Sequence, residues 1–400
     1  MNLEIILSMA GGLGLFLFGM RVMSESIEKV AGARLRQILE QLTTNRFTGI
    51  LVGAVFTAII QSSSACTVMV VSFVNSGLMN LYQAAGVIFG ANIGTTVTSL
   101  LVSFKLEKIA PVILLVGVIV VMFCKKQKIT KIGEIIIGFG ILFMGLSTMS
   151  GAMSGMKDSP TVINLFASLR MPVLAVLLGA VLKAIIQSSS VTVSIMVLMA
   201  NQGLLGLDMC MFIILGCNIG ACTSALLASL TGKKDAKRAA SIHLIFNVIG
   251  TVIVYIIFMA GVHQVVEVLS NMAHQDAGRV VAYAHIAIKL FQVAVMAPFI
   301  GLIVKLTYVL VPGSDKKIGY RDSHQLKYIG EKVVFNPATA IVEVIKELDR
   351  MASLASENLN RAMNALITLD EEEIEEVYEV EENIDFLSHA ITDYLVKINQ

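Results

Sequence analysis

The sequence predicts an all-α polytopic membrane protein with inverted-topology repeats, two re-entrant helical hairpins and additional C-terminal cytoplasmic helices. Composition, an internal repeat and a split in charge support this fold class. Hydrophobic residues make up 56% of the 400 residues, and mean hydropathy is +0.79, whereas soluble proteins hold about 45–50% apolar residues. Residues 1–312 carry 21 Lys and Arg against 11 Asp and Glu, and residues 313–400 carry 9 against 18. We therefore expect the first part to lie in the membrane and the second in water.

The first 312 residues contain an internal duplication with an offset of 126 residues. Gln61–Ser64 (Gln-Ser-Ser-Ser) recurs as Gln187–Ser190, and both copies lie inside apolar sequence. Asn92–Gly94 recurs as Asn218–Gly220 at the same offset, and the match continues without a gap well beyond both motifs. Such self-similarity at a fixed offset indicates two copies of one structural unit.

Apolar runs of about 17–23 residues are long enough to cross the roughly 30 Å hydrocarbon core of a bilayer. We expect a transport domain over residues 1–312, with repeat 1 at about 1–123, repeat 2 at about 130–261 and an extra helix at about 280–311. The predicted spanning helices lie at about 3–20, 82–103, 109–123, 132–148, 208–230, 239–261 and 280–311.

The segments around the two Ser motifs, 48–75 and 174–201, are interpreted as re-entrant hairpins. Each has an apolar half of roughly a dozen residues, a polar break and a second apolar half. A dozen helical residues reach only about 18 Å, less than the hydrocarbon core. A single continuous spanning helix is the alternative, because serine can donate to the i−4 carbonyl within a helix. In both cases the polar clusters must face protein or water.

Basic segments predict the orientation, because cytoplasmic loops are enriched in Lys and Arg. The loop 262–279 has little positive charge and is expected outside the cell. This arrangement places the N-terminus outside the cytoplasmic membrane and the C-terminal segment in the cytoplasm. Each repeat then crosses three times, so the copies are inverted and the hairpin tips meet near the midplane, as in secondary transporters. Only Lys105 and Lys108 fall on the wrong side. The segments expected in the cytoplasm are Arg21–Arg46, Lys125–Lys131, Lys233–Arg238 and Lys316–Lys317.

A helix break frees backbone N–H groups that suit an anion, and carbonyl oxygens that suit a hard cation such as Na⁺. Serine hydroxyls and glutamine amides can add donors around a small oxyanion, with cations beside it. The sequence has no Gly-x-x-x-x-Gly-Lys-Ser/Thr phosphate loop, and its six histidines lie away from the Ser motifs. We therefore expect no enzymatic activity, no cofactor and no nucleic-acid partner.

These residues resemble the type II sodium–phosphate cotransporters and their bacterial relatives over roughly residues 8–310. That family carries Gln-Ser-Ser-Ser twice, each time followed by an Asn-Ile-Gly-Thr-like stretch, as at Gly90–Thr96 and Gly216–Thr223. The resemblance implies sodium-coupled transport of inorganic phosphate by alternating access, with Na⁺ as coupling ion and the bilayer as surroundings. The residues expected to bind phosphate are Gln61, Ser62, Ser63, Ser64, Gln187, Ser188, Ser189 and Ser190. The residues expected to bind sodium are Asn92, Thr95, Thr96, Thr192, Ser194, Asn218 and Thr223.

Two departures from the family pattern bear on the number of sodium ions. Ala221 and Cys222 stand where the first repeat has Thr95 and Thr96, so oxygen ligands are lost. Lys183 stands where the first repeat has Thr57, and it either extends to the external interface or points toward the site. The functional alternatives are a transporter of another oxyanion or one driven by protons, a non-transporting phosphate sensor, and a channel.

The C-terminal part resembles the start of a PhoU-type helical bundle, with a linker at 313–335 and helices over 336–400. Apolar residues recur there at helical spacing from about Asn336, and a second helix is expected from about Asp370. Two helices are few for an independent bundle, so we expect further helices or a homo-oligomer formed through this segment. Glu381 and Asp385 share a helix face and match the metal-binding motif of that family once.

Overall fold

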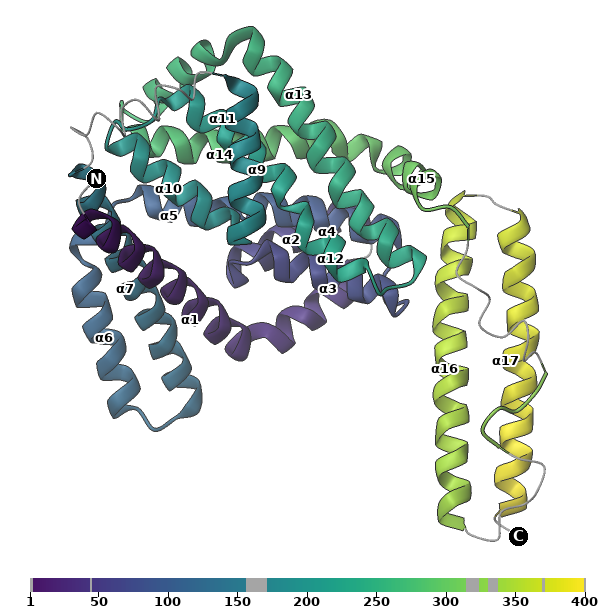
Figure 1. Cartoon of the computed structure of the whole chain (residues 1–400). Helices are drawn as coiled ribbons and strands as arrows, with labels where there is room; N and C mark the ends of the chain where they lie inside the picture. Colours follow the sequence, from purple (N-terminus) through teal and green to yellow (C-terminus); the bar gives the residue numbers. More distant parts are fainter. Residues whose placement is uncertain are drawn as a thin grey trace.

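The computed structural model describes residues 3–43, 45–155, 171–313, 324–329, 337–368 and 371–398, and these ranges contain helices, turns and loops. Figure 1 shows a body of packed helices from α1 to α15, with a long hairpin of α16 and α17 beside it. The first half of the body contains α1 (Leu3–Leu42), α2 (Arg46–Ile60), α3 (Ser63–Asn75), α4 (Leu81–Gly94), α5 (Thr96–Ser103) and α6 (Ala110–Phe123).

The second half of the body repeats this order of elements and adds further helices. It contains α7 (Gln127–Ser154), α9 (Pro172–Ile186), α10 (Ser189–Asn201), α11 (Leu207–Gly220), α12 (Cys222–Ser229), α13 (Lys234–Met272), α14 (Ala277–Met296) and α15 (Ile300–Leu310). The C-terminal hairpin consists of α16 (Pro337–Thr368) and α17 (Glu371–Ile398). Each Ser motif lies between two short helices, α2 and α3 in the first half and α9 and α10 in the second.

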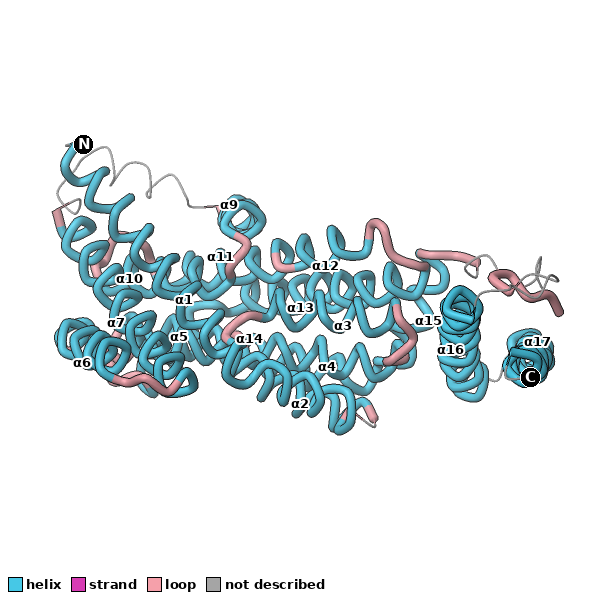
Figure 2. Tube along the Cα trace, turned by 90° about the horizontal axis from the view of Figure 1, so that it is seen from below, coloured by secondary structure: helices cyan, strands magenta, loops and turns pink. Residues whose placement is uncertain are grey.

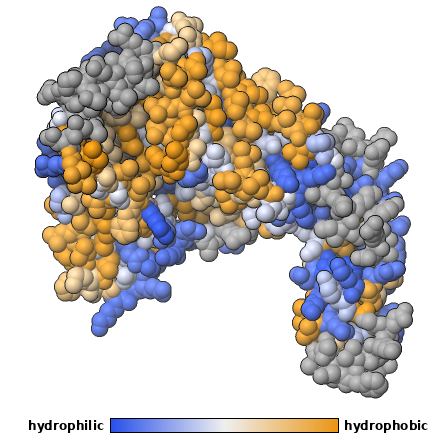
Figure 3. All heavy atoms as spheres, in the orientation of Figure 1, coloured by the Kyte–Doolittle hydropathy of each residue, from blue (hydrophilic) through white to orange (hydrophobic). Residues whose placement is uncertain are grey.

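Six helical stretches in the described residues are long and apolar enough to cross a membrane, which fits the predicted helical membrane protein. Figure 3 shows apolar residues over most of the visible face of the body, whereas the C-terminal hairpin shows many hydrophilic ones. The six stretches are Leu3–Gly32, Leu81–Ser103, Gln127–Ser154, Leu207–Ser229, Lys234–Met272 and Ala277–Leu310.

Two predicted loops were wrong. The expected loop beginning at Arg21 is helical to Leu42, and an Arg21–Glu25 ion pair one turn apart supports that continuation. Helix α13 has non-helical backbone at Gly261, where the predicted helix ends, but the loop expected beyond it is helical to Met272. Val262, Val265 and Val266 pack on the core at helical spacing there. The helix predicted at 109–123 is present as α6, although its 14 residues reach only about 21 Å, less than the thickness of the hydrocarbon core.

The duplication reappears as matching contacts in the two halves. A Cβ added at Gly90 would collide with the carbonyl oxygen of Ile50, which brings α4 against α2. At the equivalent positions 126 residues later, a Cβ added at Gly216 would collide with the carbonyl oxygen of Val176, which brings α11 against α9. Glycine permits this close backbone approach because it has no side chain. Helices α2 and α9, which precede the two Ser motifs, are therefore held in place by the same kind of glycine contact.

Helices α1 and α7, which are equivalent in the duplication, pack against each other through glycines. Gly12 faces Gly145, and Gly19 faces Gly138. Residue numbers rise along one helix as they fall along the other, so the two helices run antiparallel. Gly138 is the repeat equivalent of Gly12, and Gly145 is that of Gly19. The contact therefore maps onto itself when the two repeats are exchanged.

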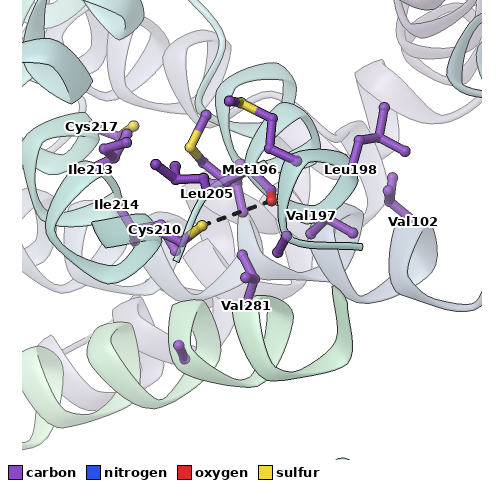
Figure 4. Packing of buried hydrophobic residues seen from close by; sticks show 14 of the residues in the cluster. Val102, Met196, Val197, Leu198, Leu205, Cys210, Ile213, Ile214, Cys217 and Val281 are labelled. Carbon is purple, nitrogen blue, oxygen red and sulfur yellow. Dashed lines mark hydrogen bonds between the residues drawn. The ribbon is translucent and has the colours of Figure 1, made fainter. Parts of the chain in front are cut away.

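Two apolar clusters fill the body, one mostly from α7, α10, α11 and α14 and the other mostly from α3, α4 and α13. Figure 4 shows part of the first, where Met196, Ile213 and Val281 gather around Cys210. The Cys210 thiol lies 4.0 Å from the carbonyl oxygen of Met196 and packs as a small apolar side chain. These clusters fix the helices that carry the polar groups described below.

The C-terminal hairpin has its own apolar seam. Ala340, Val344 and Leu354 of α16 pack with Leu387 and Ile391 of α17. Figure 2 shows the two helices nearly end-on, side by side next to α15. Other apolar residues on α16, such as Ile345 and Leu359, remain exposed, as expected of a helix with apolar residues on more than one face.

Candidate functional site

Both Ser motifs break a helix in the same way. Helix α2 ends at Gln61 with a left-handed backbone (φ 61°), and α9 ends at Gln187 with φ 58°. This conformation costs about 1–2 kcal/mol for a residue with a side chain, so both breaks are built features. Ser62 and Ser188 then cap the following helices, accepting from the Ala65 and Val191 amides at 3.2 and 3.3 Å.

The two breaks line one cavity of about 230 Å³. The first-turn amides of α3 and α10 have no partner within their own helices, and both helices begin at this cavity. Two partly positive helix ends and a group of serine hydroxyls therefore surround one space, which is the environment that an oxyanion requires. Its lining residues are Leu17, Met20, Arg21, Ser24, Gln61, Ser62, Ser63, Ser64, Gln187, Ser188, Ser189 and Ser190.

Hydroxyls on α5 and α12 join the two motifs to each other. The Ser190 hydroxyl donates to that of Thr98 at 3.1 Å, and Thr98 donates to the side-chain oxygen of Gln61. At the equivalent positions, Ser224 lies 3.2 Å from the Ser64 hydroxyl and donates to Gln187 Oε1 at 2.7 Å. Each of these two residues therefore contacts the glutamine of its own repeat and the last serine of the other repeat.

The two glutamines line the cavity and also hydrogen-bond to the ends of the helices that precede the breaks. Gln61 Nε2 donates to the carbonyl oxygen of Ala58, and Gln187 Nε2 donates to that of Ala184. Their side-chain oxygens accept from Thr98 and Ser224. The glutamines therefore hold the shape of the site, and the serine hydroxyls and helix amides are the groups best placed to face a ligand.

Arg21 is a cavity residue that sequence reasoning missed. It lies on α1 with Leu17, Met20 and Ser24, which recur at helical spacing and also line the cavity. Its Nε atom lies 2.6 Å from Glu25 Oε1. Its repeat equivalent is Ser147, so this positive charge belongs to one repeat only. The spacing of Leu17, Arg21 and Ser24 was the available signal, but Arg21 was read as the start of a loop.

Comparison with known proteins gives the family. The Na⁺/Pi-cotransporter family model matches residues 15–151 and 157–274, which together exceed half of the chain and include both Ser motifs. The chain belongs to the Na⁺/Pi-cotransporter family. Residues 348–400 match the PhoU domain, as the sequence predicted. No solved structure matches the chain.

Relatives of this family member come from bacteria and animals. "Uncharacterized protein YqeW" of Bacillus subtilis is 30% identical over 311 residues, covering 77% of this chain and 99% of that protein. "Putative inorganic phosphate export protein YjbB" of Escherichia coli is 24% identical over 397 residues, covering 98% of this chain and 71% of that protein. "Sodium-dependent phosphate transport protein 2A" of Rattus norvegicus is 36% identical over 97 residues, covering 24% and 15%.

None of the seven residues predicted to bind sodium is among the residues that line the cavity of this Na⁺/Pi-cotransporter family member, although the Thr223 hydroxyl accepts from Gln187 Nε2 at 3.2 Å. Their five hydroxyls donate to backbone carbonyls three or four residues earlier, as from Thr95 to Ala91 at 3.0 Å and from Ser194 to Ser190 at 2.7 Å. Each such oxygen keeps lone pairs that could face a cation. A sodium site at these residues stays a prediction.

Two buried lysines accompany these residues. Lys183 is 1% exposed, and its ammonium group has no hydrogen-bond partner among the described residues, so the expectation that it extends to the interface is wrong. Lys289 of α14 donates to Asn92 Oδ1 at 2.6 Å and to Asn247 Oδ1 at 3.3 Å. Three residues further along α14, Gln292 Oε1 accepts from Asn218 at 3.3 Å. Both predicted asparagines are therefore contacted by α14, whose polar face the sequence analysis did not use.

The C-terminal hairpin touches the body near the end of α3. Asn360 donates to the carbonyl oxygen of Gly77, and Lys233 lies 3.2 Å from Glu357. Within the hairpin, Glu381 accepts from Asn358 at 3.2 Å. Among the described residues no group of three His, Cys, Asp or Glu side chains could hold a metal ion. Metal binding by Glu381 and Asp385 is thus an untested prediction without a third ligand in the part of the chain that is described.

Proposed function

We propose that this chain transports inorganic phosphate across the cytoplasmic membrane, coupled to Na⁺, by alternating access of its two repeats. The single observation that carries the proposal is the shared cavity, because two motifs 126 residues apart line one space. Phosphate would bind between Ser62–Ser64 and Ser188–Ser190. Membership of the Na⁺/Pi-cotransporter family supports both the substrate and the coupling ion.

The chemistry of the cavity favours a tetrahedral anion. Serine hydroxyls and first-turn amides approach from two helices, and each helix end favours a negative charge by about 0.3–1 kcal/mol. Arg21 adds a planar guanidinium, whose paired donors match two phosphate oxygens. An arrangement with donors on opposite sides can also be opened from either side without losing all contacts at once.

The packing of α1 on α7 supports inverted repeats. The Gly12–Gly145 and Gly19–Gly138 contacts are related by a two-fold axis perpendicular to the two helices, as in an isologous interface. If both helices cross the bilayer, this axis lies in the membrane plane, and the two copies have opposite orientations. The short pairs α2–α3 and α9–α10 would then be re-entrant hairpins entering from opposite leaflets, with the N-terminus outside and the C-terminal hairpin in the cytoplasm.

The negative charge of phosphate gives a physical reason for coupling its transport to sodium. Phosphate carries negative charge into a low-dielectric site, and cations bound beside it reduce that cost. The hydroxyl and amide oxygens around Thr95, Thr192 and Thr223 are ligands of the kind that hard cations prefer.

The proposal is tested by labelled phosphate flux in proteoliposomes made from the full chain. Accumulation should require an imposed Na⁺ gradient and should fail when choline replaces Na⁺. Sulfate or carboxylates in excess should compete weakly. Because the Escherichia coli relative is named for export, the gradient is applied in both directions. Accumulation that ignores Na⁺, or that follows sulfate as well as phosphate, would reject this function.

A non-transporting phosphate sensor is the second candidate, and one contact favours it. Helix α3 begins in the first Ser motif, and the turn that follows it is held by Asn360 of the PhoU domain. Occupancy of the cavity could thus reach the C-terminal hairpin through α3. A sensor would bind phosphate in detergent and show no accumulation under any gradient.

A further inference from the structure

Lys289 is a buried lysine whose ammonium group lies among side-chain oxygens. The residue lies in the middle of α14 and is 3% exposed. Its ammonium group contacts the side-chain oxygens of Asn92 on α4 and Asn247 on α13, at 2.6 and 3.3 Å. Three helices therefore meet at this one ammonium group.

The two asparagines are fixed with their oxygens toward that charge. Asn92 Nδ2 donates to the carbonyl oxygen of Ile88 at 2.9 Å, and Asn247 Nδ2 donates to that of His243 at 3.0 Å. Because each amide nitrogen is tied to its own helix, each amide oxygen must point away from it. Two neutral oxygens converging on one buried point form part of a cation site, of the kind that Na⁺ also accepts.

Among the described residues, no carboxylate forms an ion pair with this ammonium group. None of the ion pairs of the described residues includes Lys289 or Lys183. A buried charge without a counterion is costly unless another group compensates it. In a protein that carries an anion through its interior, the anion can supply that compensation.

We propose that Lys289 is a tethered cation that fills the Asn92–Asn247 oxygen pair in place of one free coupling ion. The ammonium group supplies the charge that a sodium ion would otherwise bring. This chain therefore uses one sodium ion fewer than it would if the Asn92–Asn247 oxygen pair were free to bind Na⁺. The lower number of coupling sodium ions rests on the proposed transport function. The cation site itself can be tested without transport.

The test measures thermal unfolding of the full chain in detergent, with NaCl or choline chloride at equal ionic strength. Lys289→Ala removes the ammonium group and opens space beside two oriented oxygens, so free Na⁺ should bind there. Its unfolding temperature should rise by a few degrees in NaCl, in a saturable way, because a ligand that binds only the folded state stabilises it. Lys289→Met, which fills the space without charge, should not gain this response. Lys305→Ala, which removes an exposed lysine of α15, should behave as the wild type.

A second variant covers poor folding of Lys289→Ala. Lys289→Ala with Asn247→Asp supplies a carboxylate, which should make folding depend on Na⁺ still more strongly. An unfolding temperature with the same Na⁺ response as the wild type in both variants overturns the proposal. Failure of both variants to fold in NaCl also overturns it, because the free ion is expected to replace the ammonium group. Neither result depends on phosphate flux, so a failed transport assay is a separate outcome.

Discussion

The Thr98 hydroxyl lies 3.1 Å from the Ser190 hydroxyl, although the two residues belong to different repeats. Thr98 also donates to Gln61, so one side chain connects both breaks. Ser224 makes the equivalent pair of contacts, to Gln187 and Ser64. The cavity is thus closed by a symmetric pair of hydrogen-bonded links, and the first prediction concerns them.

Thr98→Val keeps the shape of the side chain and removes its hydroxyl. It should lower phosphate flux about tenfold, because losing hydrogen bonds worth about 0.5–1.5 kcal/mol each frees Gln61 and Ser190 from their positions. Flux in proteoliposomes and thermal unfolding measure the effect. Thr148→Val is the matched control, since Thr148 is exposed and donates only within α7. Equal flux in the two variants would show that the link does not shape the site.

Ser63→Ala and Ser189→Ala each remove one hydroxyl from the cavity wall. Each should reduce phosphate uptake sharply, by tenfold or more, because a hydrogen bond to a charged ligand is worth about 1.5–3 kcal/mol. Ser72→Ala on the exposed side of α3 is the control. Near-normal uptake in both cavity variants would refute the assignment of these serines.

Arg21→Gln should raise the phosphate concentration needed for half-maximal flux by about tenfold, while leaving the unfolding temperature near that of the wild type. Removal of an exposed guanidinium costs binding rather than folding. Arg21→Lys should recover part of the loss, because it keeps the charge but not the paired donors. Arg34→Gln, on the exposed surface of the same helix, should change neither quantity. A normal half-maximal concentration in Arg21→Gln would remove Arg21 from the site.

Gly90→Ala and Gly216→Ala should destabilise the protein strongly, since the new methyl group would meet the carbonyl oxygens of Ile50 and Val176. Overpacking of this kind costs about 1–3 kcal/mol or more. Gly14→Ala, where nothing lies within 4 Å, should be neutral or slightly stabilising. Thermal unfolding distinguishes the three, and equal unfolding temperatures would contradict the equivalent packing of the two repeats.

Lys183→Thr gives the second repeat the residue that the first has at Thr57. It should raise the unfolding temperature, because the buried ammonium group of Lys183 has no hydrogen-bond partner and its burial is costly. It should also change the Na⁺ dependence of flux if the ammonium group acts on the site. Lys305→Thr on α15 is the exposed control. A lower unfolding temperature together with unchanged Na⁺ dependence would contradict both expectations.

The sequence predicted the helical membrane class, the breaks at Gln61 and Gln187 and the PhoU helices, because each rests on local pattern. The duplication predicted that the two breaks are equivalent, and the structure adds that they line one cavity. Arg21 was misplaced because charge in an apolar run resembles a loop, although the ion pair with Glu25 keeps it helical. The roles of Thr98 and Lys289 depend on helices far apart in sequence, and a single chain gives no local signal for such contacts.

The central claim is that both Ser motifs bind one and the same phosphate, and equilibrium binding tests it directly. Labelled phosphate is titrated onto the purified full chain in detergent with NaCl, and the number of phosphates bound per chain is measured. We predict one phosphate per chain, and we predict that Ser63→Ala and Ser189→Ala each weaken that whole binding event. Two phosphates per chain, or loss of half of the bound phosphate in each variant, would contradict a shared site.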